Sequence, residues 1–259
     1  FASVGVVQAL ADRGAGGAVC FASGFLEAQA EDTQGAELQA DLLEAADDMP
    51  ILGPNCYGFV NALDRTAVWP DQHGMQPVDR GVAILTQSSN IAINMTMQTR
   101  GLPIAYALTA GNQAQIGLSE LAMAVLDDPR VSSLGMHIEG FDSVPGMEAL
   151  AQRARELAKP VIALKVGRSI QAQQAAMTHT ASLAGSHAAS SAFLKRLGIG
   201  EVDSIESMLE TLKLLHVHGP LAGYRLCSMS CSGGEASLMA DAAQGSKVCF
   251  PALSPEQKA

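Results

Sequence analysis

Apolar runs of strand length alternate with stretches of helical periodicity along almost the whole chain, and this alternation limits the fold more than any other feature. Strands that are nearly continuous in apolar residues are covered on both faces of a sheet. We therefore predict an α/β fold with parallel sheets and helices on both faces. The candidate strands lie at 17–22, 82–86, 104–108, 134–138, 161–166 and 226–230.

Amphipathic stretches fill the spaces between these strands. Apolar residues repeat at helical spacing over 118–125 and over 205–215, which predicts two helices that each bury one face. Asp203 and Glu206 stand where the cap of the second helix and its reciprocal partner would be.

Turn-forming residues divide the chain into pieces. The stretch 65–80 is rich in Pro, Gly and Asp and is typical of a linker. It separates a front piece, 1–64, from a complete unit at 81–217, and a tail at 220–259 is too short to hold a core of its own. The first residues resemble the middle of a helix, and 254–257 resembles a helix start with a capping box. We therefore expect an internal segment of a longer polypeptide.

The composition excludes several classes of partner. Of 259 residues, 16 are Lys or Arg and 26 are Asp or Glu, so the net charge is −10, and aromatic residues make up 4%. An acidic chain with no basic run and few aromatic side chains is a poor nucleic-acid or anionic-membrane binder. No apolar run reaches the roughly 20 residues of a membrane helix. We predict a soluble, cytoplasmic protein that binds neither nucleic acid nor membranes.

The cysteine and histidine spacing predicts no metal site. The cysteines are scattered, and the pair Cys227 and Cys231 has no second Cys or His pair nearby to complete a zinc site. We expect reduced thiols.

A turn directly after the short apolar run 49–52 carries candidate binding residues. Ligands of an open parallel sheet bind beyond the carboxyl ends of its strands. The sequence Gly-Pro-Asn-Cys-Tyr-Gly at 53–58 would present Asn55 and Cys56 at that edge. The alternative is a well-formed turn around a buried thiol.

A second turn suits a phosphate group. Ser88, Ser89 and Asn90 stand between a predicted strand and a predicted helix. The free N–H groups and the dipole of a helix start attract anions, although a plain N-cap explains the same residues.

A carboxylate and an imidazole complete the candidates. Glu139 follows the apolar strand 134–138, and His179 lies in a stretch of small and polar residues. Imidazole is a good nucleophile toward phosphoryl groups, and an acceptor such as Glu139 would orient its second nitrogen. Taken singly, such residues are more commonly a solvated glutamate and an ordinary loop histidine, but their combination with a phosphate-suited helix start in one sheet favours a site.

The order of these motifs resembles that of the NDP-forming (ADP-forming) acyl-CoA synthetases, relatives of the succinyl-CoA synthetase α subunit. The resemblance covers essentially the whole chain, and its Gly-Pro-Asn-Cys and His-Thr-x-x-Leu-Ala-Gly stretches are specific. It rests on Ser23-Gly24-Phe25, the turn at 53–58, Gln87-Ser88, Gly111-Asn112, Ile138-Glu139, and His179-Thr180 with Leu183-Ala184-Gly185.

This resemblance implies a CoA-binding Rossmann domain, then two flavodoxin-like domains, with an ATP-grasp module on the same or a partner chain. Residues 1–64 would be the second half of the Rossmann domain and 81–217 the first flavodoxin-like domain. Residues 220–259 would be the truncated start of the second.

The resemblance also implies roles for single residues. The histidine that matches His179 is phosphorylated in this family, and the glutamate that matches Glu139 holds its ring. Ser88, Ser89 and Asn90 would receive the phosphate. The residues expected to lie near CoA or substrate are Ser23, Gly24, Asn55, Cys56, Gly111 and Asn112.

The implied reaction joins a small carboxylic acid to CoA in three transfers. A phosphoryl group passes from ATP, bound with Mg²⁺ by the ATP-grasp domain or subunit, to His179, and then to the acid. The CoA thiol attacks the acyl phosphate and releases phosphate. A homo- or hetero-oligomer is expected, and the segment by itself is expected to be unable to complete the reaction.

Two residues depart from the family pattern. Ser89 replaces a usual glycine, which would narrow the room for phosphate or substrate, and Ala181 replaces another. A non-catalytic module that senses CoA or acyl-CoA and a structural scaffold are the alternatives, because fold does not fix function. The presence of both Glu139 and His179 favours the enzyme.

Overall fold

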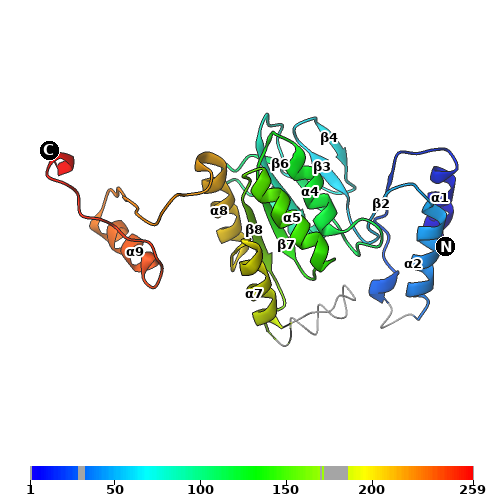
Figure 1. Cartoon of the computed structure of the whole chain (residues 1–259). Helices are drawn as coiled ribbons and strands as arrows, with labels where there is room; N and C mark the ends of the chain where they lie inside the picture. Colours follow the sequence, from blue (N-terminus) through cyan, green and yellow to red (C-terminus); the bar gives the residue numbers. More distant parts are fainter. Residues whose placement is uncertain (1, 29–32, 170, 172–185, 259) are drawn as a thin grey trace. The chain divides into compact units, whose positions relative to one another are not determined.

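The computed structural model of the chain describes residues 2–28, 33–169, 171 and 186–258 (Figure 1). The chain divides into two compact units, Phe1–Gly219 and Pro220–Ala259. Among the helices described, none is long and apolar enough to cross a membrane.

The front of the larger unit is a small α/β layer. Strands β1 and β2 pair in parallel, and the helix predicted at the start of the chain is confirmed as α1. The strand predicted at 17–22 is shorter than expected, because only two of its residues pair. The elements are α1 (Ala2–Ala11), β1 (Ala18–Val19), the 3-10 helix η1 (Leu26–Ala28), α2 (Gly35–Ala46) and β2 (Ile51–Leu52).

The rest of the larger unit is built on a seven-stranded sheet in the order β4-β3-β6-β5-β7-β8-β9 (Figure 1). Neighbouring strands from β6 to β9 pair in parallel, which confirms the predicted α/β class. The strands are β3 (Phe59–Asn61), β4 (Thr66–Val68), β5 (Gly81–Thr86), β6 (Ile104–Thr109), β7 (Val131–Ile138), β8 (Val161–Lys165) and β9 (Gly200–Glu201).

The sheet also contains an antiparallel hairpin that the sequence reading missed. Strand β3 pairs antiparallel with β4 and with β6, so the predicted linker 65–80 contains a strand. The hairpin turn is closed by Asn61, whose Oδ1 accepts hydrogen bonds from the N–H groups of Leu63 (3.0 Å) and Asp64 (3.1 Å). The domain boundaries remain a prediction.

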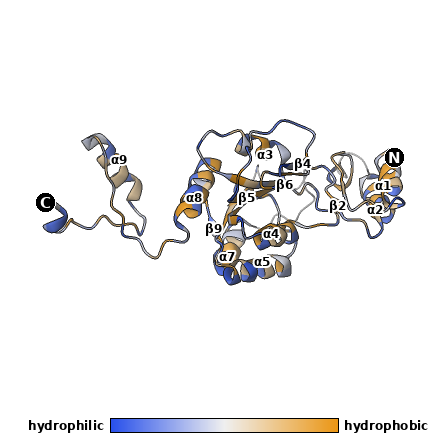
Figure 2. Cartoon of the chain, turned by 90° about the horizontal axis from the view of Figure 1, so that it is seen from above, coloured by the Kyte–Doolittle hydropathy of each residue, from blue (hydrophilic) through white to orange (hydrophobic). Residues whose placement is uncertain are grey.

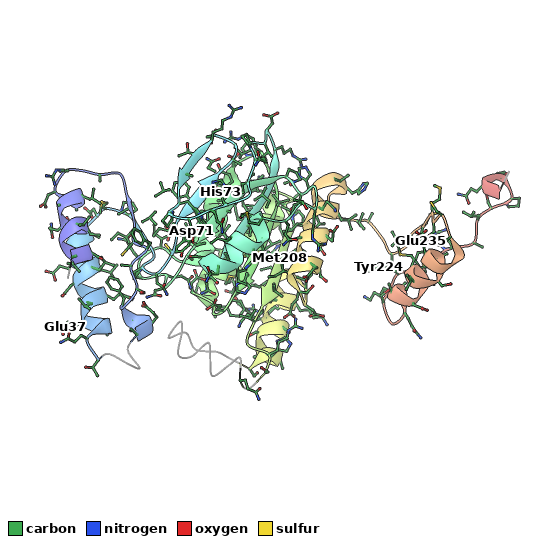
Figure 3. All side chains as sticks on the ribbon, turned by 180° about the vertical axis from the view of Figure 1, so that it is seen from behind. Glu37, Asp71, His73, Met208, Tyr224 and Glu235 are labelled. Atoms are coloured by element: carbon green, nitrogen blue, oxygen red, sulfur yellow. The ribbon has the colours of Figure 1, made fainter. Side chains whose placement is uncertain are left out.

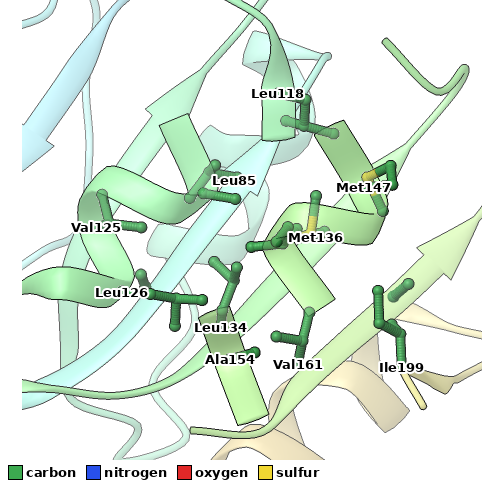
Figure 4. Packing of buried hydrophobic residues seen from close by; sticks show 14 of the residues in the cluster. Leu85, Leu118, Val125, Leu126, Leu134, Met136, Met147, Ala154, Val161 and Ile199 are labelled. Carbon is green, nitrogen blue, oxygen red and sulfur yellow. The ribbon is translucent and has the colours of Figure 1, made fainter. Parts of the chain in front are cut away.

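Helices cover both faces of the large sheet (Figure 2). On one face, α4, α5 and α7 pack over a core that includes Leu118, Leu134 and Met147 (Figure 4). On the other face lie α3 and α8, where Met208 is wholly buried (Figure 3). The helices are α3 (Ser89–Thr96), α4 (Leu118–Asp127), α5 (Val144–Glu156), α7 (His187–Leu197) and α8 (Ile205–His218).

The predicted cap of α8 is wrong by one residue. Ser204 is the N-cap, and its Oγ accepts a hydrogen bond from the N–H of Ser207 at 3.1 Å. The carboxylate of Asp203 instead forms an ion pair with Arg168 at 2.5 Å. The Asp203 carboxylate, which the pattern assigned to the helix cap, therefore pairs with the Arg168 guanidinium instead.

The smaller unit contains α9 (Gly233–Ala243) and the 3-10 helix η2 (Glu256–Lys258). The strand predicted at 226–230 is absent from this described stretch, because the only pairing nearby is an isolated bridge between Arg225 and Cys249. The capping box predicted at 254–257 is confirmed by reciprocal bonds between Ser254 and Gln257.

Candidate functional site

The predicted phosphate turn lies at the carboxyl end of β5. Ser88 is the N-cap of α3, and its Oγ accepts a hydrogen bond from the N–H of Ile91 at 3.5 Å. Ser88 and Ser89 are half-buried, and Asn90 is exposed. The first N–H groups of the helix and its dipole can therefore meet an anion at the surface. This geometry is compatible both with a plain helix N-cap and with a phosphate-binding turn.

A buried polar pair supports this turn from below. Thr86 Oγ1 accepts a hydrogen bond from the N–H of Ser88 (3.0 Å), donates to its carbonyl (3.2 Å) and lies 3.0 Å from His137 Nδ1. A hydroxyl has one proton and two lone pairs, so all three contacts are satisfied when Nδ1 carries the imidazole proton. Burial, aided by the charge of Lys165, lowers the pKa of His137 to about 4. His137 is therefore neutral at pH 7.

Glu139 lies at the neighbouring strand end, directly after β7, and is half-buried. Gln87 Oε1 accepts a hydrogen bond from the N–H of Glu139 at 2.5 Å. Because Gln87 directly precedes Ser88, the serine turn and the predicted acidic residue are connected through one side chain. Burial lowers the pKa of Lys165, and the carboxylates of Glu139 and Glu201 act in the opposite direction.

The turn at 53–58 is bonded to the serine turn. The N–H of Tyr57 donates to Ser89 Oγ (3.1 Å) and to Thr109 Oγ1 (3.0 Å). The N–H of Asn55 donates to the carbonyl of Ala22 at 2.9 Å. The Ser89 hydroxyl, at a position where the resemblance led us to expect a glycine, thus has a local partner in the neighbouring turn.

The turn after β6 packs directly against the turn at 53–58. The N–H of Asn112 donates to the carbonyl of Pro54 at 2.9 Å. Gly111 has a φ of +55°, and a Cβ at this position would lie 2.6 Å from the carbonyl oxygen of Asn55. Only glycine permits both this backbone conformation and this approach.

Glu27 connects the Ser23-Gly24 segment to the same edge. Its Oε1 accepts a hydrogen bond from the N–H of Gly24 at 2.8 Å, and its Oε2 accepts one from Asn112 Nδ2. Ser23, Gly24 and Asn55 are exposed, so they are accessible to a ligand. The structure therefore brings together the residues that the resemblance placed near CoA or substrate.

Cys56 is the exception among them, because its side chain is wholly buried. Burial raises the pKa of the Cys56 thiol to about 11, against the opposing effect of hydrogen bonds with Gly58 and Thr109. The thiol therefore packs inside the turn, which corresponds to the alternative interpretation of this motif. Asn55 is the side chain that the turn offers to solvent.

His179 and Ala181 lie outside the described residues, so the predicted pair of His179 and Glu139 stays a prediction. Within the described ranges, no group of three or more His, Cys, Asp or Glu residues is placed to hold a metal ion.

The sequence motifs gave no role to four side chains that organise this edge: Gln87, Thr109, Glu27 and Lys165. A signal was available for Lys165, because a lone charge that ends an apolar strand is unusual. A signal was also available for Gln87, which adjoins the serine turn.

Comparison with known proteins identifies the family. Residues 79–215 match the succinyl-CoA ligase-like flavodoxin domain, which is more than half of the 259 residues. The chain therefore belongs to the NDP-forming acyl-CoA synthetase family.

Curated relatives are similar over nearly the whole chain. It is 29% identical over 246 residues to trans-feruloyl-CoA synthase FCS1 from an unknown prokaryotic organism, covering 93% of this chain and 35% of that protein. It is 30% identical over 237 residues to the alpha subunit of ADP-forming acetate–CoA ligase II of Pyrococcus furiosus, covering 89% and 50%. The chain thus spans half or less of the length of these relatives.

Solved structures share the fold. The dinucleotide forming acetyl-coenzyme A synthetase 1 of Candidatus Korarchaeum cryptofilum superposes with a TM-score of 0.79 in its apo form. The identity is 26%, and the match covers 96% of this chain and 54% of that one. A complex of the same enzyme with phosphate and ADP also gives a TM-score of 0.79, at 27% identity.

Proposed function

We propose that the protein containing this chain is an acid–CoA ligase that forms acyl-CoA and ADP from a carboxylic acid, CoA and ATP. Its family membership supports this reaction class. The relatives are named for different acids, among them acetate, 4-hydroxybutyrate and ferulate, so the proposal extends to the reaction and not to one acid.

The observation that carries the proposal is the continuous set of contacts along one sheet edge. Gln87 connects the serine turn to Glu139, and Ser89 connects it to the turn at 53–58. That turn is bonded in its own right to Asn112. The candidate phosphate turn, the carboxylate of Glu139 and the candidate CoA-binding surface therefore all lie at the carboxyl edge, where ligands of such sheets bind.

The residues at this edge fit the polar groups of CoA. Ser23 and Asn55 are exposed, and Asn112 is half-buried, so hydroxyl and amide groups are available to amides and hydroxyls of a ligand. CoA would supply a thiol as the acyl acceptor. The wholly buried thiol of Cys56 is not among the groups proposed to contact CoA.

His179 is the proposed nucleophile. Its ring nitrogen forms a P–N bond with the γ-phosphorus of ATP as the bond to ADP breaks, and it then passes the phosphoryl group to a carboxylate oxygen. The acyl phosphate gives acyl-CoA and inorganic phosphate when the CoA sulfur attacks the acyl carbon. Glu139 would hold the imidazole ring, and the start of α3 would stabilise the phosphoryl charge.

An ATP-grasp domain or partner subunit would deliver ATP and Mg²⁺. The name of the Pyrococcus furiosus relative includes "subunit alpha", which supports a partner subunit as one arrangement. A cytoplasmic location is part of the same proposal.

The test is labelling of the complete protein, with its ATP-binding domain or subunit, by γ-³²P-ATP. We expect an acid-labile, base-stable phosphoprotein that His179→Ala abolishes. His73→Ala is the matched control, because His73 is exposed and lies outside the candidate site.

Label that persists in His179→Ala removes His179 from the reaction. A protein that binds CoA but neither takes up label nor forms acyl-CoA supports the sensing module instead. Glu139→Gln should reduce labelling without loss of the fold.

A further inference from the structure

Two side chains, Gln87 and Lys165, bond the backbone of Glu139 and Gly140. Gln87 Oε1 accepts hydrogen bonds from the N–H groups of Glu139 (2.5 Å) and Gly140 (3.0 Å), and Gln87 Nε2 donates to the Gly140 carbonyl (3.0 Å). Lys165 Nζ donates to the Glu139 carbonyl at 2.8 Å. Both N–H groups and both carbonyls of this dipeptide therefore have side-chain partners.

These contacts begin where the sheet ends. The last bond of the β7–β8 ladder runs from the N–H of Val166 to the carbonyl of Ile138 at 3.0 Å, one residue before Glu139. Beyond that point no strand among the described residues pairs with the chain. Gln87 and Lys165 are each only 5% exposed, so water does not compete for these groups.

The Lys165 ammonium is an unusual group to bury. It donates to two carbonyls, those of Glu139 and Val166 (2.6 Å), and lies 5.9 Å from the centre of the Phe141 ring. A buried charge is costly unless it is well bonded. Its position at the predicted site, rather than at the surface, needs a reason beyond stability.

We infer that Gln87 and Lys165 form a clamp that sets the direction in which Glu139 leaves the sheet relative to the serine turn. This inference rests on the proposed function, because it makes both side chains positioning residues for the proposed phosphohistidine step. Gln87 connects the two parts of the site, because it directly precedes Ser88 in the chain and its side chain is hydrogen-bonded to the backbone of Glu139.

Lys159 provides a matched control within the same sheet. Its Nζ also donates to two carbonyls, those of Leu126 (2.5 Å) and Asp128 (2.6 Å), but at the opposite edge, before β8 begins. Burial lowers the pKa of Lys159, as it does that of Lys165. Lys165 is buried and Lys159 is half-buried, but the two lysines make the same kind of contact and differ in whether their carbonyl partners belong to the candidate site.

The experiment compares Lys165→Met, Lys165→Arg and Lys159→Met in the complete protein. It measures the rate of phosphoenzyme formation from γ-³²P-ATP, kcat and KM for acyl-CoA formation, and the melting temperature. We expect Lys165→Met to slow phosphoenzyme formation and kcat by about 10- to 100-fold, because a misplacement of about 1 Å costs this much. We expect the KM for CoA to change by no more than about threefold, and Lys165→Arg to restore part of the rate.

Lys159→Met should lower the melting temperature, by no more than Lys165→Met does because Lys159 is only half-buried, yet leave kcat at the wild-type value. Equal phosphorylation rates in Lys165→Met and wild type would overturn the clamp, and so would an equal loss of kcat in Lys159→Met. If Lys165→Met does not fold, Gln87→Met decides by the same readouts, because it removes three of the four contacts. A wild-type protein that takes up no label overturns the proposed function itself.

Discussion

The two edges of the large sheet are built by different means. At the carboxyl edge, turns approach one another backbone to backbone and are held by buried side chains such as Gln87 and Thr109. At the amino edge, Arg130 forms ion pairs with Asp64 and Asp128, both at 2.8 Å, and the Arg130 side chain is 40% exposed.

The two kinds of contact suit different purposes: one fixes the position of site residues and the other contributes to the stability of the fold. Exposed ion pairs contribute little and are screened by salt, and they tolerate movement of long side chains. Buried hydrogen bonds between short side chains and backbone leave little freedom, and a lost partner is costly. We infer that the carboxyl edge is organised for geometry and the amino edge for stability, so substitutions at the two edges should have separable effects.

The strongest test of this comparison uses two glycines on either side of β6. Gly111 and Gly101 both have positive φ values, +55° and +71°, but a Cβ on Gly101 would have no atom within 4 Å. Gly111→Ala should therefore destabilise the protein by about 2 kcal/mol or more and reduce kcat at least about tenfold. Gly101→Ala should cost about 1 kcal/mol, with no change in kcat.

Urea unfolding and acyl-CoA formation measure the two quantities. Because backbone strain is common to both variants, their difference isolates the close approach of Gly111 to the turn at 53–58. An equal loss of unfolding free energy in the two variants would show that the close approach of Gly111 to the turn at 53–58 does not restrict the residue at this position.

Arg130→Met tests the amino edge and should affect stability alone. The Arg130 guanidinium, with a further hydrogen bond from Tyr106, holds the pKa of Asp128 well below its usual range. A carboxylate whose pKa is depressed in the folded state stabilises the protein at pH values above its unfolded pKa of about 4. This stabilising contribution is lost as the pH falls toward the folded pKa. Arg130→Met should therefore lower stability at pH 7 and flatten its decline below about pH 4.

Urea unfolding at a series of pH values from neutral to acid measures this effect. Arg100→Met is the control, because Arg100 pairs with Glu210, whose side chain is 46% exposed. The substitution should therefore change the pH dependence of stability less than Arg130→Met does. A loss of kcat in Arg130→Met at neutral pH would contradict the division between the edges.

The parallel core of the fold could be predicted because its signal is local. Five of the predicted apolar runs overlap β1 and β5 to β8, and helical periodicity located α4 and α8. The hairpin β3–β4 was missed because its strands are three residues each and its turn depends on Asn61. The expected strand at 226–230 failed because an apolar run needs a partner strand as well as composition.

The candidate site divides in the same way. Motif order located the turn at 53–58, the serine turn and the turn at 111–112, because each follows a strand. The sequence could not say that Cys56 is wholly buried, nor that Gln87 and Lys165 hold Glu139, because those facts depend on contacts between residues distant in the chain. Burial of a given residue is a property of packing, which no local pattern contains.

Ser89→Gly is the mildest test and addresses the departure from the family pattern. The Ser89 hydroxyl accepts a hydrogen bond from the N–H of Tyr57, which also donates to Thr109. Losing one of two acceptors should cost no more than about 1 kcal/mol, and glycine at the start of a helix adds little. We expect kcat and the KM values for acid and CoA to stay within about twofold of wild type.

A double-mutant cycle with Thr109→Val sharpens this prediction. In the Thr109→Val background the N–H of Tyr57 depends on Ser89 alone, so Ser89→Gly should cost on the order of 1 kcal/mol more than it does in the wild type. Strictly additive costs would show that the two hydroxyls do not share this donor. A marked rise in turnover or a wider range of acids in Ser89→Gly alone would instead show that the hydroxyl narrows the substrate site, as the sequence pattern first indicated. The sign of that single change therefore decides whether Ser89 belongs to the support of the carboxyl edge or to its specificity.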